Sequence, residues 1–183
     1  QYKGGIIDFV KHLNASREAL FNKVANYEAS EADQTLDIAL QWNTGYYEGI
    51  YGYANGISTV EGGMHVEGFK TALTRVVNQY ARKNNFIKEK ESNLSGDDVR
   101  EGLTAVISVR LSNPMFNSQD KRRLTNIEVE GIVNTIVGEG LTTFLEENPA
   151  AAKSILDKAL TAQKAREAAR KASDLVKRQN ALE

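Results

Sequence analysis

The feature that most constrains the fold is the C-terminal stretch after Pro149, which contains neither glycine nor proline from Ala150 to Glu183. Pro149 suits the first turn of a helix, because its missing N–H would have no partner there. Roughly 30 helical residues at 1.5 Å each would reach about 45–50 Å, longer than the body of such a chain is wide. Between Leu160 and Leu175 the only apolar residues are alanines, which bury little surface. The sequence therefore predicts a long helix whose C-terminal part projects from the domain.

Charge is divided unevenly between this helix and the rest of the chain, although the full sequence carries a net charge of only −1. Residues 149–183 hold eight basic and four acidic side chains, a net charge of +4. The other 148 residues hold 15 basic and 20 acidic side chains, a net charge of −5. Such asymmetry suggests an electrostatic partner for the basic end. Charge alone, however, favours a solvated helix with ordinary i,i+4 ion pairs.

Hydrophobic periodicity predicts an α+β body over residues 1–148. Thr35–Trp42 alternates and Leu103–Leu111 is nearly all apolar, as in strands, whereas Phe69–Tyr80 repeats at helical spacing. Turn residues after Trp42 predict that residues 34–57 form a hairpin. The other expected elements are strands over 24–29 and 50–57, helices over 4–14, from Ser95 and over 129–145, and a loop over 112–126. We expect a mostly antiparallel four-stranded sheet with helices on one face, and residues 149–183 as part of the same structural unit.

The residue inventory excludes several classes of site. The chain has no cysteine, which removes disulfides, thiolate metal sites and cysteine nucleophiles, and its two histidines are far apart, so we expect no metal site. No apolar run approaches the roughly 18 residues of a membrane span, and we expect no membrane partner. The chain starts with Gln1 rather than methionine, and we expect it to be a piece of a longer protein.

The usual catalytic motifs are also absent from the sequence. It has no P-loop, no dinucleotide fingerprint and no nucleophile elbow. Asp97 and Asp98 are neighbouring carboxylates, but their place at a helix start favours capping of that helix. His65 lies at a strand-to-helix junction, where we expect a structural hydrogen bond, and we expect Trp42 to pack in the core. Spacing alone therefore predicts a domain without a complete active site.

Residues 112–126 stand out, because a loop of about 15 residues without secondary structure is often functional. The loop carries Gln119 and Asp120, followed by three basic residues, Lys121, Arg122 and Arg123. A lysine and a neutral amide on an exposed loop can reach a phosphate site of a neighbour, because lysine donates three hydrogen bonds and carries a full charge. Composition alone favours a solvated surface loop.

Five motifs of the sequence occur together, in order, in one known family. They are Tyr2–Gly5, Ile38–Asn43, Glu61–Phe69, Ser95–Val106 and Ala165–Ala172. The set resembles the transducer domain, which is the second domain of the ATP-binding subunits of bacterial type IIA topoisomerases, and that of DNA gyrase B in particular. The resemblance covers essentially the whole chain. It implies a ribosomal-protein-like fold with a left-handed β-α-β crossover, an exception to the right-handed rule.

The resemblance also implies a role in ATP-driven DNA strand passage. In the family, ATP and Mg²⁺ bind to a preceding GHKL-type domain, and a transducer loop with the pattern Gln-Thr-Lys touches the γ-phosphate. Gln119 and Lys121 match this pattern, with Asp120 in place of the threonine. By this resemblance Gln119 and Lys121 are γ-phosphate contacts and Lys121 is catalytic. The chain alone, without the preceding domain, is expected to hold no cofactor and to be inactive.

Partners and location follow from the same resemblance. They are double-stranded DNA, a second copy of gyrase B, gyrase A, the upstream ATPase domain and a downstream metal-binding cleavage domain, in the bacterial cytoplasm at the nucleoid. The side chains expected to face DNA are Lys70, Arg166, Arg170 and Lys171. Two alternatives stay open: the same domain in the corresponding subunit of topoisomerase IV, and a stand-alone interaction module with a basic helical arm.

Overall fold

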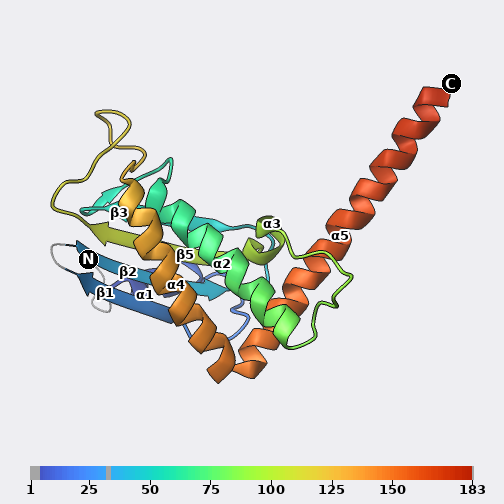
Figure 1. Ribbon diagram of the computed structural model, residues 1–183, viewed down its shortest axis with the longest axis horizontal. Coiled ribbons are helices and arrows are strands. Elements are labelled where there is room, and N and C mark those ends of the chain that lie inside the picture. The colour runs from blue at the N-terminus through green and yellow to red at the C-terminus, as the bar shows by residue number, and fades with distance from the viewer. Residues whose placement is uncertain (1–4, 32–33, 183) are drawn as a thin grey trace.

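The computed structural model describes residues 5–31 and 34–182, so the motif residues Tyr2, Lys3 and Gly4 and the expected helix start at residue 4 lie outside the described part. A five-stranded sheet with the strand order β1-β2-β5-β3-β4 forms its centre (Figure 1). The elements are α1 (Gly5–Leu13), β1 (Ala25–Glu31), β2 (Gln34–Trp42), β3 (Gly49–Ala54), β4 (Ile57–Ser58), α2 (Met64–Lys83), α3 (Gly96–Arg100), β5 (Leu103–Arg110), α4 (Ile127–Glu147) and α5 (Pro149–Leu182). The predicted α+β class is therefore confirmed.

The predicted strand over 50–57 is two strands, which makes the sheet five-stranded rather than four-stranded. Asn55 and Gly56 have φ values of 50° and 79°. Two successive residues with positive φ form the tight turn whose twist suits a β-hairpin, and Asn-Gly is the usual sequence for it. The chain reverses at this turn, and β4 pairs antiparallel with β3.

The predicted hairpin over 34–57 is wrong, because β5 lies between β2 and β3. β5 pairs antiparallel with β2 and parallel with β3, so the sheet is mixed. Leu103–Ile107 is buried on both faces, and a strand of this kind is stabilised by a neighbour on each side. On its other side, β2 pairs antiparallel with β1. The path from β3 to its parallel neighbour β5 includes α2 and α3 and is a β-α-β crossover, whose left hand stays a prediction.

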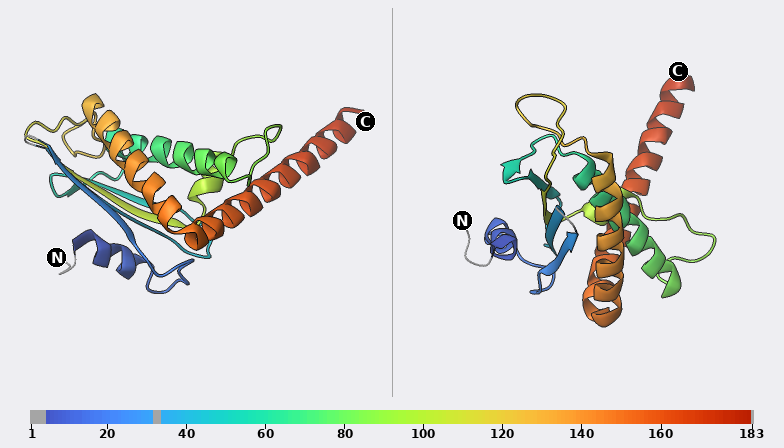
Figure 2. Two further views of the ribbon diagram at one scale, coloured as in Figure 1. Left: turned by 60° about the horizontal axis from the view of Figure 1, so that its bottom comes forward. Right: turned by 60° about the vertical axis from the view of Figure 1, so that its left-hand side comes forward.

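Helices cover both faces of the sheet, so the expectation of helices on one face is wrong. α2 and α4 pack on one face and contribute Phe69, Leu73 and Leu141 to the main core. Figure 2 shows α1 on the opposite face. There Val10 of α1 forms a second, small core with Ala39 and Val106, which are the apolar residues of β2 and β5 on that face.

α5 is a single helix of 34 residues, and its projection is confirmed (Figure 1). Its buried residues are Ala152, Ile155, Leu156 and Ala159, all near its start. From Ala168 to Leu182 every residue is exposed. No helix in the described part of the chain combines the length and the apolar character that crossing a membrane requires.

Candidate functional site

The loop over 112–126 is attached to the segment that begins α2. The Glu61 N–H donates to the carbonyl of Arg122 at 2.8 Å, and the Met64 N–H donates to the carbonyl of Leu124 at 3.0 Å. Leu124 is fully buried between these two segments. The loop therefore has a fixed base, at the end of the sheet where β5 ends and α2 and α4 begin (Figure 1).

Gly63 makes this close approach possible. It has a φ of 142° and forms a bridge with Leu124. A Cβ at this position would lie 2.5 Å from the carbonyl oxygen of Leu124, which is far inside contact distance. The Gly62-Gly63 step of the motif at 61–69 thus serves to hold the loop against α2.

The tip of the loop is a turn that ends at Lys121. The Lys121 N–H donates to the carbonyl of Ser118 at 3.2 Å, and Lys121 has a φ of 57°, a conformation uncommon for a side chain other than glycine. The Asp120 carboxylate accepts a hydrogen bond from the Ser118 hydroxyl and lies 3.9 Å from a guanidinium nitrogen of Arg122. Arg122 also pairs with Glu61 at 3.3 Å. The negative charge of Asp120 is thus engaged by its neighbours within the loop.

Gln119 and Lys121, the two predicted phosphate contacts, are both exposed on this turn. The ammonium of Lys121 lies 5.9 Å from the centre of the Phe116 ring, within range of a cation–π contact. Within the described residues this ammonium forms no ion pair. The arrangement leaves one cation and one amide available to an anion supplied from outside the chain.

The four residues expected to face DNA lie on α2 and α5, apart from the loop. Lys70 is half-buried, and Arg170 and Lys171 are exposed. That these three contact DNA stays a prediction. The guanidinium of Arg166 is instead occupied, because it donates to the two carboxylate oxygens of Asp98 at 3.1 and 3.0 Å. Sequence reasoning missed this pair.

Asp98 and His65 have the structural roles that their positions predicted. Asp98 and Ser95 form a reciprocal capping box at the start of α3. His65 is fully buried, and its Nε2 lies 3.2 Å from the Thr59 hydroxyl. Burial lowers the pKa of His65 to about 4, so the imidazole is neutral near pH 7. Trp42 is buried as expected and donates from its indole to the carbonyl of Val99 at 3.1 Å.

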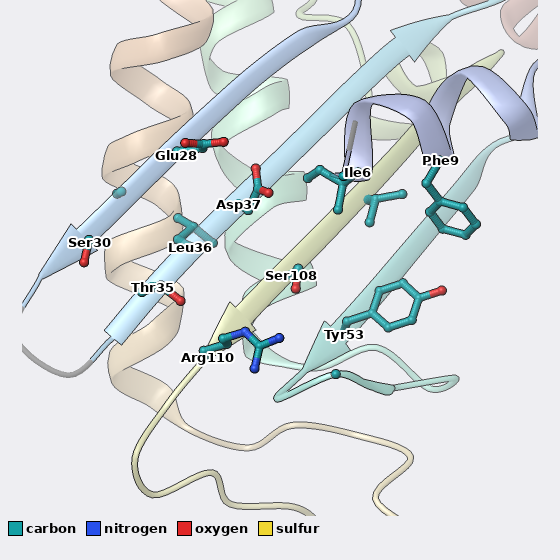
Figure 3. Close-up of a pocket in the computed structure, with 14 residues that line it drawn as sticks. Ile6, Phe9, Glu28, Ser30, Thr35, Leu36, Asp37, Tyr53, Ser108 and Arg110 are labelled. Carbon is teal, nitrogen blue, oxygen red and sulfur yellow. The ribbon is translucent and has the colours of Figure 1, made fainter. Parts of the chain in front are cut away.

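A cavity of about 800 Å³ on the other face of the sheet was not foreseen from the sequence (Figure 3). It lies beside α1, between Ile6 and Phe9 of that helix and Asp37, Tyr53 and Arg110 on the strands. The sequence signal that could have indicated this cavity is the alternation of β2, which places polar residues such as Asp37 on this face of the sheet. None of the predicted site residues lines this cavity, so the loop is the better candidate site.

Comparison with known proteins gives matches over essentially the whole chain. The profile of the family described as DNA gyrase B matches residues 5–175. The DNA gyrase B protein of Clostridium acetobutylicum is 51% identical over 183 residues, which is all of this chain but only 29% of the relative. The chain therefore spans less than a third of that relative.

Solved structures show the same fold. The 43K ATPase domain of Thermus thermophilus gyrase B, in complex with an aminocoumarin, matches with a TM-score of 0.86 and 42% identity, over 94% of this chain and 46% of that one. The topoisomerase IV ATP-binding domain of Francisella tularensis, in complex with a small-molecule inhibitor, matches with a TM-score of 0.72 and 28% identity, over 91% and 44%.

Proposed function

Because the chain belongs to the DNA gyrase B family, we propose that it is the transducer domain of an ATP-dependent type II DNA topoisomerase, within DNA gyrase B. The observation that carries the proposal is the loop over 112–126, whose base is fixed and whose tip presents Gln119 and Lys121 to the outside. The domain comprises a body over 1–148 and the helix over 149–183, which leads to the next domain.

Lys121 is the proposed sensor of the γ-phosphate of ATP. ATP supplies the phosphoanhydride that is hydrolysed, and it is bound, with Mg²⁺, by the preceding domain of the same protein. Lys121 donates hydrogen bonds and a full positive charge to the terminal phosphate, and Gln119 adds a neutral donor. The Thermus relative supports this division, because it is an ATPase domain and the chain covers only 46% of it. This chain alone is expected to hydrolyse no ATP.

The surroundings of Asp120 support the fit of Gln119 and Lys121 to a phosphate. The carboxylate beside Lys121 would repel an anion if it turned inward. Asp120 instead accepts from Ser118 and lies near Arg122, so its charge is engaged by these two neighbours. Closure of two such subunits around ATP would then move the body relative to its partner domains.

DNA strand passage is the proposed output of this movement. Lys70, Arg170 and Lys171 are the proposed contacts to double-stranded DNA; Arg166 is left out of this set because Asp98 engages it. The other proposed partners are a second copy of gyrase B, gyrase A and the downstream metal-binding cleavage domain. The proposed setting is the bacterial cytoplasm at the nucleoid.

The proposal also includes the left hand of the crossover from β3 to β5, as the family resemblance implies.

The alternatives have less support. The topoisomerase IV structure is 28% identical, whereas the gyrase structure is 42% identical, which favours gyrase. A stand-alone module with a basic arm is disfavoured, because the whole chain matches one part of a longer enzyme subunit.

Limited trypsin digestion of the intact protein tests the phosphate contact directly. Lys121, Arg122 and Arg123 are adjacent cleavage sites, and a non-hydrolysable ATP analogue should protect them while ADP, which lacks the γ-phosphate, should not. Lys88 and Lys90, exposed on another loop, serve as the internal control and should be cut equally in all samples. Equal cleavage at the loop with ATP analogue and ADP would contradict the proposed contact.

A further inference from the structure

α5 is held by the body along only its first part, and Arg166 is the end of that part. Four residues between Ala152 and Ala159 are buried. Gln163 then donates to the carbonyl of Asn93 at 3.3 Å, and Arg166 bonds to Asp98. Beyond Arg166, no residue of α5 in the described part of the chain bonds to the body. The rest of the helix extends from this last contact.

The position of Arg166 matters because the direction of the projecting part of α5 depends on where the helix last contacts the body. The contacts from Ala152 to Gln163 support about 16 Å of helix, and the contact at Arg166 extends the supported length to about 21 Å. The unsupported part up to Leu182 shortens from about 28 Å to about 24 Å. A contact this far along the helix restricts its direction more than the same contact near its base would.

Asp98 is a rigid anchor for this contact. Only 3% of its surface is exposed. Its N–H donates to the Ser95 hydroxyl, and its carboxylate accepts from the Ser95 N–H at 3.0 Å, so α3 fixes its position. Burial acts to raise the pKa of Asp98, but the hydrogen bonds from Arg166 and Ser95 and the charge of Arg166 outweigh it and hold the pKa below its usual range. The carboxylate is therefore ionised near neutral pH.

The strand β5 connects this anchor to the loop over 112–126. α3 leads through Gly102 into β5, and β5 ends at Arg110, just before the loop (Figure 1). The eight residues of β5 span about 26 Å and are paired on both sides. The Asp98 anchor and the loop thus lie at opposite ends of one central strand.

We propose that the Asp98–Arg166 ion pair sets the direction of the projecting part of α5 and thereby couples the nucleotide-sensing loop to the arm that leads to the DNA-cleaving parts. The coupling half of the proposal rests on the proposed function; the positioning half rests on the geometry alone. Asp98 and Arg166 are positioning residues, since neither contacts nucleotide or the reacting groups.

A distance measurement on this chain tests the positioning half. The chain has no cysteine, so Gln79→Cys on the body and Gln179→Cys on the arm give one unambiguous pair of spin labels. Arg166→Gln should shift the label-to-label distance distribution and widen it, because Gln163, held by a single hydrogen bond to Asn93, would then be the last contact of α5 with the body. Asp98→Asn, which keeps an acceptor for Ser95, should do the same. Lys164→Gln, an equal loss of charge on an exposed neighbour, should leave the distribution unchanged.

Circular dichroism of each variant separates arm movement from unfolding. Unchanged helix content with a widened distribution supports the proposal, and so does an intermediate distribution for Arg166→Lys, which keeps the charge and loses the paired geometry. A distance distribution in Arg166→Gln identical to that in Lys164→Gln overturns the proposal, independently of any measurement of ATP hydrolysis or strand passage.

The intact enzyme tests the coupling half. ATP hydrolysed per strand-passage event should rise roughly fivefold in Arg166→Gln, the low end of measured coupling between sites, and stay unchanged in Lys164→Gln. A moved arm with an unchanged ratio overturns the coupling half. Failure of the proposed function would show differently, as normal hydrolysis in a Lys121 variant, and would leave the distance result valid.

Discussion

The ammonium of Lys121 lies 5.9 Å from the centre of the Phe116 ring. The backbone of Phe116 forms an antiparallel β-bridge with Leu124, which is buried at the base of the loop. The aromatic ring therefore gives the lysine a support that belongs to the fixed part of the loop. An ammonium held in this way loses little freedom when an anion arrives, which favours a phosphate contact.

Lys121→Ala in the intact protein should lower the rate of ATP hydrolysis by roughly 10²–10³, the usual cost of removing one donor to transition-state charge. ATP affinity should change little, because in the proposed contact the lysine meets only the terminal phosphate. Gln119→Ala should cost less, since a neutral donor contributes less than a charged one. Steady-state hydrolysis and equilibrium binding measure the two effects, with the exposed Lys88→Ala as control. Wild-type turnover by Lys121→Ala would remove the loop from the catalytic site.

Asp120→Thr should change hydrolysis by less than about fivefold, because exposed ion pairs contribute up to about 1 kcal/mol. Its carboxylate accepts from the Ser118 hydroxyl and lies 3.9 Å from a guanidinium nitrogen of Arg122. The same hydrolysis assay measures this effect. Asp97→Asn, which neutralises an exposed carboxylate on α3, is the control. A large gain in rate would show instead that Asp120 opposes nucleotide binding.

Local patterns in the sequence predicted local structure well. The apolar stripe from Phe69 to Tyr80 became the buried face of α2, and the alternation in Thr35–Trp42 became β2. The loop over 112–126 was visible because it lacks any period. The turn at Asn55-Gly56 was equally local, and its sequence alone would have divided the strand.

Long-range pairing could not be found in the same way. β5 lies between β2 and β3 although it begins about 60 residues after β2 ends and about 50 residues after β3 ends, and nothing in the spacing of β2 and β3 leaves room for it. Arg166 and Asp98 are 68 residues apart, and each had a sufficient local interpretation, one as a basic side chain and the other as a cap. Only the fold shows that they share one ion pair.

His65 predicts a pH dependence of stability. Burial lowers its pKa to about 4, whereas the unfolded chain keeps the ordinary value of 6.5. Between these pH values the unfolded chain binds a proton that the folded chain does not, so the free energy of unfolding falls as the pH drops from 6.5 toward 4, by roughly 3 kcal/mol in all. Above pH 6.5 this contribution is fully present.

Urea unfolding of the chain at pH 7 and pH 5 measures this dependence. His65→Gln removes the titrating group and should flatten the change between the two pH values. His12→Gln, at the other, exposed histidine, is the matched control. Equal pH dependence in all three proteins would show that His65 does not contribute.

Lys70 should contact DNA by charge and not by sequence. It lies on α2 beside the buried stripe and is half-buried, so its ammonium can face outward while its stem packs. The exposed part of α5 offers basic side chains and, from Pro149 onward, no aromatic residue on which a base could stack. Phosphate contact is therefore the mode that these residues support, and such contact weakens steeply with salt.

Lys70→Glu should weaken strand passage by the intact enzyme and its coupling to ATP hydrolysis, because reversing the charge removes one phosphate contact and adds a repulsion. The loss relative to wild type should be largest at low salt and shrink as salt rises, because salt weakens both effects. DNA cleavage should persist, since the proposed function assigns it to other parts of the protein. Lys88→Glu makes the same change of charge on an exposed loop and should behave as wild type. Supercoiling or relaxation activity is measured across a salt titration for all three proteins. If Lys70→Glu and Lys88→Glu give the same curve as wild type, Lys70 is an ordinary surface lysine, and α2 does not face the transported DNA.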